Sequence, residues 1–130
     1  MMKKVIGMAL LASLLACPVS AQSGIDAWMT KAREAKAGGM FNESIDALDK
    51  VLSVNARHEE APVLMGRNYG AKREIKKAIV FLERAIEVNP KSVHAHRFLA
   101  LSWASLRKLK KALKHAKLAS QYGPKVWEAH

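Results

Sequence analysis

The chain of 130 residues has the length of a single domain, and 50% of its residues are apolar, which suffices for a packed core and disfavours disorder. Ala, Leu, Lys and Glu are abundant whereas aromatic residues make up only 6%, a composition that favours an all-helical fold. The 22 Lys and Arg against 11 Asp and Glu give a formal net charge of +11, so the chain as a whole attracts anionic partners.

Residues 1–21 have the order of a secretory signal peptide. A positive start at Lys3 and Lys4 is followed by an apolar stretch, and small residues precede the bond after Ala21 at the positions that a signal peptidase reads. The apolar stretch is shorter than the ~20 residues that a membrane-spanning helix needs. We therefore predict bacterial export, cleavage after Ala21, and a soluble periplasmic or secreted domain over residues 22–130.

A second interpretation of the same stretch is a lipoprotein signal. Leu14-Leu15-Ala16-Cys17 resembles a lipobox, in which the Cys is lipidated and anchors the new N-terminus to a membrane. Leu15 and the proline directly after the Cys weigh against it. If cleavage follows Ala21, the mature chain keeps no Cys, which excludes a disulfide framework, a thiolate zinc site and a Cys nucleophile.

The rest of the chain repeats with a period of 34 residues, in units at 25–58, 59–92 and 93–126. Small residues recur at one position in the first half of each unit, namely Ala32, Gly66 and Ala100. Small or apolar residues recur at three positions of the second half: Ser44, Ala78 and Ala112; Leu48, Leu82 and Ala116; Val51, Ala85 and Ala119. Three units in register indicate a repeat protein.

This pattern resembles that of the tetratricopeptide repeat family. The second unit matches it best, through Met65-Gly66, Tyr69, Ala78, Leu82, Ala85 and Pro90. The first unit keeps Trp28 and Gly39 but has Lys31 where the family has Leu. Over residues 25–126 the resemblance implies an all-α fold, an α-solenoid of three stacked helix-turn-helix units. Its first helices would form a concave face that binds a protein or peptide.

Helix packing and helix-ending residues give the same elements independently of the family. The small recurring residues let two helices approach to ~8–10 Å. Pro90 and Pro124 end helices because proline lacks the N–H group, and Ser92 can cap the helix that follows. We expect six helices, near residues 25–37, 41–55, 59–71, 75–88, 92–105 and 108–122.

Four polar residues are candidates for the concave, partner-binding face. Arg33 and Arg67 are one period apart, so we expect them to stack on adjacent first helices, with Asn68 beside them and Arg97 on the third. Such a ladder would hold carboxylates of a peptide through charge-assisted hydrogen bonds. The alternative is a set of unrelated surface residues.

The third unit is strongly basic, with eight Lys or Arg and no acidic residue. Most of these residues lie on its second helix: Arg107, Lys108, Lys110, Lys111, Lys114 and Lys117. They are interpreted as a solvated outer face, or as a surface for an anionic partner. Four leucines opposite them are expected in the core, the alternative being a membrane-surface helix: Leu106, Leu109, Leu113 and Leu118. Trp127 is expected to fold back near Leu118 and Tyr122, or else to anchor a partner or second copy.

Nothing in the sequence points to catalysis. His94 and His96 are two residues apart on an expected helix and point in different directions, which is a poor metal pair. There is no phosphate-binding loop and no recognisable nucleophile with its base. We expect no metal, cofactor or small-molecule substrate. Nucleic acid is disfavoured because aromatic residues do not alternate with the lysines as a base-stacking surface requires.

The expected function is that of an exported, non-catalytic interaction module, an adaptor or assembly factor in the bacterial cell envelope. Its partner would be a protein or peptide, with acidic character favoured by the charge. The alternative is a self-associating structural component, or a lipoprotein anchored at Cys17, that meets anionic surfaces through the basic third unit. Membrane association would require that lipid or the basic helix.

Overall fold

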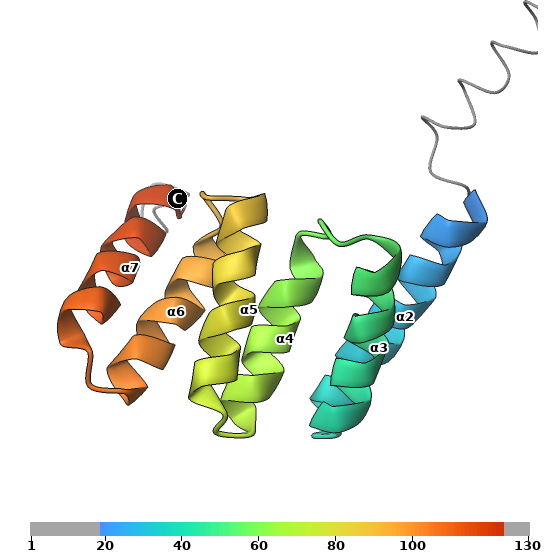
Figure 1. Ribbon diagram of the computed structural model, residues 1–130, viewed down its shortest axis with the longest axis horizontal. Coiled ribbons are helices and arrows are strands. Elements are labelled where there is room, and N and C mark those ends of the chain that lie inside the picture. Colours follow the sequence, from blue (N-terminus) through green and yellow to red (C-terminus); the bar gives the residue numbers. More distant parts are fainter. Residues whose placement is uncertain (1–18, 124–130) are drawn as a thin grey trace, which may run out of the picture.

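The computed structural model describes residues 19–123, which form six helices and no strand (Figure 1). The helices are α2 (Val19–Ala37), α3 (Phe41–Val54), α4 (Glu60–Ala71), α5 (Ile75–Val88), α6 (Val93–Ser105) and α7 (Leu109–Tyr122). All six expected helices are present and their bounds agree to within a residue, except that α2 begins at Val19 rather than 25. Cys17, Pro124 and Trp127, for which the sequence made predictions, lie outside the described residues.

Consecutive helices pack as three antiparallel pairs, α2 with α3, α4 with α5 and α6 with α7, and the pairs stack side by side along the molecule (Figure 1). Each pair stacks on the next through the contacts of α3 with α4 and of α5 with α6. This is the predicted all-α solenoid. Within the described range no helix is long and apolar enough to cross a membrane.

The turn inside each pair follows the 34-residue period at the level of single hydrogen bonds. Gly39, Arg73 and Arg107 adopt left-handed backbone conformations with φ of 76°, 67° and 60°. Bonds that span the end of each first helix close these turns: Met40 N to Ala35 O, Glu74 N to Tyr69 O and Lys108 N to Trp103 O, at 2.8, 2.9 and 2.9 Å. They are the six-residue bonds of a Schellman motif. The sequence signals this conformation only at the glycine, because arginine has no preference for it.

Ala32 and Gly66 are packing positions, as predicted, whereas Ala100 is half-buried and lines a groove between α6 and α7. Ala32 is fully buried, and a Cβ added at Gly66 would lie 2.5 Å from Leu82 Cγ. Leu82 belongs to a buried cluster with Ile79 and Leu99, which joins the second pair to the third. Ser92 caps α6 as expected, since its Oγ accepts a hydrogen bond from the Ala95 N–H at 3.2 Å.

The expectation that the leucines of α7 lie in the core is wrong for two of them. Leu109 is 70% exposed and Leu113 is 55% exposed, whereas Leu106 and Leu118 are half-buried. In the first two pairs the equivalent face is covered by the first helix of the next pair. No described helix follows α7, so its apolar side has no such cover.

A histidine pair joins α6 to α7. His96 is buried, its Nε2 lies 2.7 Å from the Pro90 carbonyl oxygen, and its Nδ1 lies 3.1 Å from Nδ1 of His115. Burial, together with the neighbouring His96 and Lys114, lowers the pKa of His115. His94 is exposed, so the two histidines of α6 point apart as predicted, and no cluster among the described residues could hold a metal ion.

Candidate protein-binding surfaces

Arg33 is a surface residue that forms an ion pair with Glu60 of a neighbouring helix. Its Nε donates to Oε1 of Glu60 at 3.1 Å and its Nη2 donates to Oε2 at 2.6 Å. These hydrogen bonds to Glu60 raise the pKa of Arg33. About half of each side chain is exposed, so the pair contributes at most ~1 kcal/mol to stability. Arg33 therefore links α2 to α4, and a partner would have to compete with Glu60 for it.

The guanidinium groups of Arg67 and Arg97 both lie close to the ring of Phe98. The guanidinium carbon of Arg67 lies 4.9 Å from the centroid of Phe98, and that of Arg97 lies 5.5 Å from it. Both arginines are exposed, and neither forms an ion pair with a carboxylate in the described part of the chain. The structure thus brings two of the four predicted residues together, through Phe98 rather than by stacking on Arg33.

Arg67 lines a groove of about 410 Å³ between the first helices α4 and α6, which we call the first-helix groove. Lys36 at the end of α2 and Arg73 in the turn after α4 also line it, and no Asp or Glu does. Burial and the positive charge of Arg67 lower the pKa of Lys36. Basic groups gathered without a carboxylate form a site that favours an anion.

Asn68 does not belong to this surface, contrary to the prediction. Its side chain is 0% exposed, and its Nδ2 donates to Ser44 Oγ at 2.8 Å. The Ser44 hydroxyl in turn donates to the Ala32 carbonyl oxygen at 2.8 Å. The next residue along a helix is turned by about 100°, so Asn68 faces the first pair while Arg67 faces solvent. Asn68 holds three helices together and is closed to a partner.

The predicted basic surface is solvent-exposed throughout. Its members all lie on α7 or in the turn before it: Arg107, Lys108, Lys110, Lys111, Lys114 and Lys117. The Lys111 amine lies 4.3 Å from the Trp103 ring centroid. None of the six residues forms an ion pair with a carboxylate in the described part of the chain. This part of the surface is therefore open to anionic partners.

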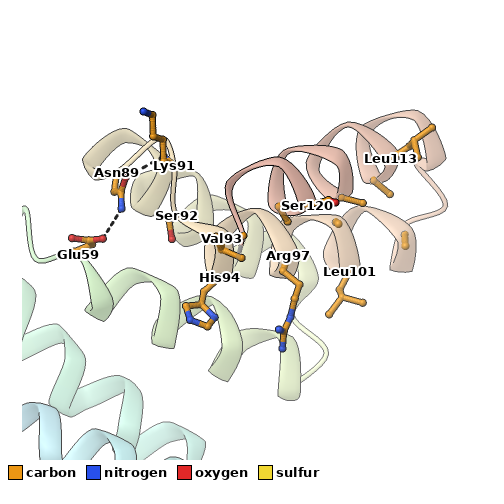
Figure 2. A pocket seen from close by; sticks show the side chains of 16 residues that line it. Glu59, Asn89, Lys91, Ser92, Val93, His94, Arg97, Leu101, Leu113 and Ser120 are labelled. Carbon is orange, nitrogen blue, oxygen red and sulfur yellow. Dashed lines mark hydrogen bonds between the residues drawn. The ribbon is translucent and has the colours of Figure 1, made fainter. Parts of the chain in front are cut away.

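The sequence interpretation missed a large groove that lies between α6 and α7 and that we call the end groove (Figure 2). It has a volume of about 1140 Å³, and both helices contribute apolar residues to it: Ala100, Leu101 and Ala104 from α6, with Ala112, Leu113, Ala116 and Ala119 from α7. Figure 2 shows Leu101 and Leu113 on the two neighbouring helices, with Arg97 beside Leu101. The signal was present in the 34-residue register for α7, because Ala112, Leu113, Ala116 and Ala119 match Ala78, Ile79, Leu82 and Ala85, which are buried in the second pair.

Comparisons with known proteins agree with this fold. Residues 62–92 match the tetratricopeptide repeat family model. The crystal structure of MamA superposes with a TM-score of 0.73 at 23% identity, over 77% of this chain and 58% of that one. The first tetratricopeptide domain of Spaghetti (RPAP3), bound to the HSP90 peptide SRMEEVD, superposes with a TM-score of 0.76 at 17% identity, over 79% and 82%. No curated protein matches the sequence significantly.

The same fold also occurs inside an enzyme chain. A Thermobaculum terrenum O-GlcNAc transferase mutant superposes with a TM-score of 0.78 at 22% identity, and this chain covers 21% of its length. The chain therefore has an all-α tetratricopeptide repeat fold, which serves as a protein interaction module in other proteins.

Proposed function

We propose that the chain is an exported, non-catalytic adaptor or assembly factor of the bacterial cell envelope, which binds an acidic segment of a partner protein in the first-helix groove. Lys36, Arg67 and Arg73 line that groove without any acidic residue, and this is the observation that carries the proposal. The RPAP3 domain, with the same fold, holds a peptide whose sequence SRMEEVD is acidic. Phe98 and Leu101 add apolar contacts beside the charges.

Arg67→Glu tests the groove. With fluorescein-labelled SRMEEVD as an acidic probe, we expect the change to raise Kd about tenfold or more. The change removes a positive charge from the groove and puts in its place a negative charge, which repels the acidic peptide. Fluorescence anisotropy at low salt measures the affinity. The matched control is Arg84→Glu on α5, since Arg84 also lies over an aromatic ring, 5.5 Å from the centroid of Phe81, and lines neither groove. Equal losses in both variants would show that net charge alone governs binding.

Such an outcome favours the second candidate function, in which the chain meets anionic surfaces through α7. The observation that supports this candidate is the exposure of all six basic residues on α7 and in the turn before it, none of which forms an ion pair with a carboxylate in the described part of the chain. A lipid anchor at Cys17 or self-association would then place that helix on a membrane or in a larger assembly.

Export rests on the order of charge, apolar stretch and small residues before Ala21. We expect the mature protein in its own cells to begin at Gln22, with the formal charge lowered to +9 by the loss of Lys3 and Lys4. Intact-mass measurement of the purified native protein checks this. A lipid-modified Cys17 would show instead that the protein is anchored, and a retained Met1 would show that the segment is not a signal.

A further inference from the structure

We propose that the end groove binds an amphipathic α-helix of a partner protein, apolar along one side and acidic along its flanks. The inference takes from the proposed function only that the chain binds proteins, since the ligand is a helix and the two grooves share Leu101 alone.

The end groove is the structural equivalent of a surface on which, in the preceding pair, the next helix packs. Moving Ala100 and the α7 residues of its lining back by 34 residues gives Gly66, Ala78, Ile79, Leu82 and Ala85, whereas Leu101 corresponds to the exposed Arg67. On that surface α6 packs, with Ala95 against Ala85, and Leu99 with Phe98 against Ile79 and Leu82. Moving it back once more reaches residues such as Leu48 and Val51, against which α4 packs through Ala61 and Met65. The end groove therefore has the shape and chemistry that hold a helix in this protein.

Two large apolar side chains in the end groove are exposed. Leu101 is 58% exposed and Leu113 is 55% exposed. The surrounding small residues, Ala104 and Ala116 among them, leave room for the backbone of a helix to approach closely. Covering two such leucines releases ordered water and stabilises a complex.

The charges around the groove select an acidic helix. Lys91 and Arg97 line one side. Lys110 and Lys117 lie one turn before and one turn after Leu113 on α7, at the spacing where helix side chains are neighbours, and both are exposed. The acidic residue in the lining, Glu59, already accepts a hydrogen bond from Asn89 Nδ2 at 2.6 Å (Figure 2).

A second copy of this chain fits the groove poorly from either of its ends. If α2 of another copy docked as the next first helix, it would present Thr30, Lys31 and Glu34, which are exposed, at the positions where α4 has the buried Leu64, Met65 and Asn68. If two end grooves faced each other, two Lys-rich α7 helices without acidic residues would be brought together against their mutual repulsion. A helix of another protein meets neither obstacle.

The probe is a labelled synthetic peptide of about 18 residues, long enough to populate a helix in water. It carries Ala, Phe and Leu at the spacing of Ala95, Phe98 and Leu99, with Glu at the flanking positions; a second peptide has Lys in place of each Glu. We expect the acidic peptide to bind more tightly than the basic one in fluorescence anisotropy.

Leu113→Glu should weaken binding of the acidic peptide about tenfold or more, because it places a negative charge in the apolar part of the end groove. Val80→Glu is the matched control, since Val80 is 56% exposed on α5 and lines neither groove, and it should leave Kd unchanged. Both residues are exposed, so folding should survive, which circular dichroism verifies. The double variant Lys110→Glu, Lys117→Glu should reverse the preference between the two peptides.

Four outcomes overturn the proposal. The acidic peptide may show no saturable binding, or may bind Leu113→Glu as well as the unchanged protein. A mass that doubles with concentration in light scattering, and no longer does so in Leu113→Glu, would identify a second copy as the occupant. Binding that arises only in Trp127→Ala would identify the chain's own segment 124–130 as the occupant. Retained binding of SRMEEVD in Leu113→Glu would show that these failures leave the first-helix groove untouched.

Discussion

Gly66→Leu is expected to lower the melting temperature by about 5–20 °C. A Cβ at this position would lie 2.5 Å from Leu82 Cγ and 2.7 Å from Leu82 Cδ2, well inside van der Waals contact. Leu82 is fully buried, so it has little room to move away. Overpacking of this kind costs about 1–3 kcal/mol or more, and 1 kcal/mol is worth about 4–8 °C in a domain of this size. Thermal unfolding followed by circular dichroism measures the change.

Alanine substitutions at two glycines of α4 give the matched comparison. In an open helix, Gly→Ala stabilises by up to about 1 kcal/mol because it restricts the unfolded chain. A Cβ at Gly70 meets nothing within 4 Å, so Gly70→Ala should be neutral or stabilising. At Gly66 the clash with Leu82 should outweigh this gain, and Gly66→Ala should destabilise. The same sign at both positions would mean that the close approach of α4 and α5 is not what requires the glycine.

Asn68→Asp is expected to cost about 3 kcal/mol or more of folding free energy at pH 7. The side chain is fully buried, and the change removes the Nδ2 donor that bonds Ser44 Oγ. The Ser44 hydrogen is already given to the Ala32 carbonyl, and Oδ1 of Asn68 has no partner among the described residues. A carboxylate here would be a buried charge without donors, which costs several kcal/mol.

The pH dependence of that variant follows from the same burial. Its carboxyl pKa in the folded state should lie above the unfolded value of about 3.9. Between these two pKa values the folded state therefore binds more protons than the unfolded state does, and lowering the pH stabilises the folded state. The penalty relative to the unchanged protein should therefore shrink toward pH 4 and grow toward pH 7. Denaturant unfolding at the two pH values measures it. Asn42→Asp, on the exposed first turn of α3, is the control and should stay within about 0.5 kcal/mol at both. A small, pH-independent cost at position 68 would contradict its role in the core.

Periodicity was sufficient to predict the six helices, their bounds apart from the start of α2, and the packing positions of the first two units. A period of 34 residues with small residues at positions such as 32 and 66 constrains where two helices can touch, whatever the rest of the chain does. The cap at Ser92 was predicted from the local sequence, because a hydroxyl group just before a helix can accept a hydrogen bond from an N–H group within three residues of it.

The binding surfaces were predicted only in part. Equal spacing placed Arg33 and Arg67 on equivalent faces, but it could not show that Glu60, 27 residues from Arg33, takes that guanidinium. Which charges pair depends on side chains from different helices, and the linear order does not hold that information. Asn68 was assigned to the surface next to Arg67, although one residue along a helix turns the side chain toward the neighbouring pair.

The end groove shows the same division between sequence and tertiary structure. The sequence determines that Leu113 lies on a face that could be buried, because helical spacing fixes which residues share a face. Whether such a face is buried depends on the helix stacked beyond it, and that is a property of the folded arrangement. In the first two pairs the next first helix provides that cover, whereas beyond α7 no described helix does. The same pattern therefore forms core in one pair and a candidate binding groove in another, and only the position in the stack separates the two.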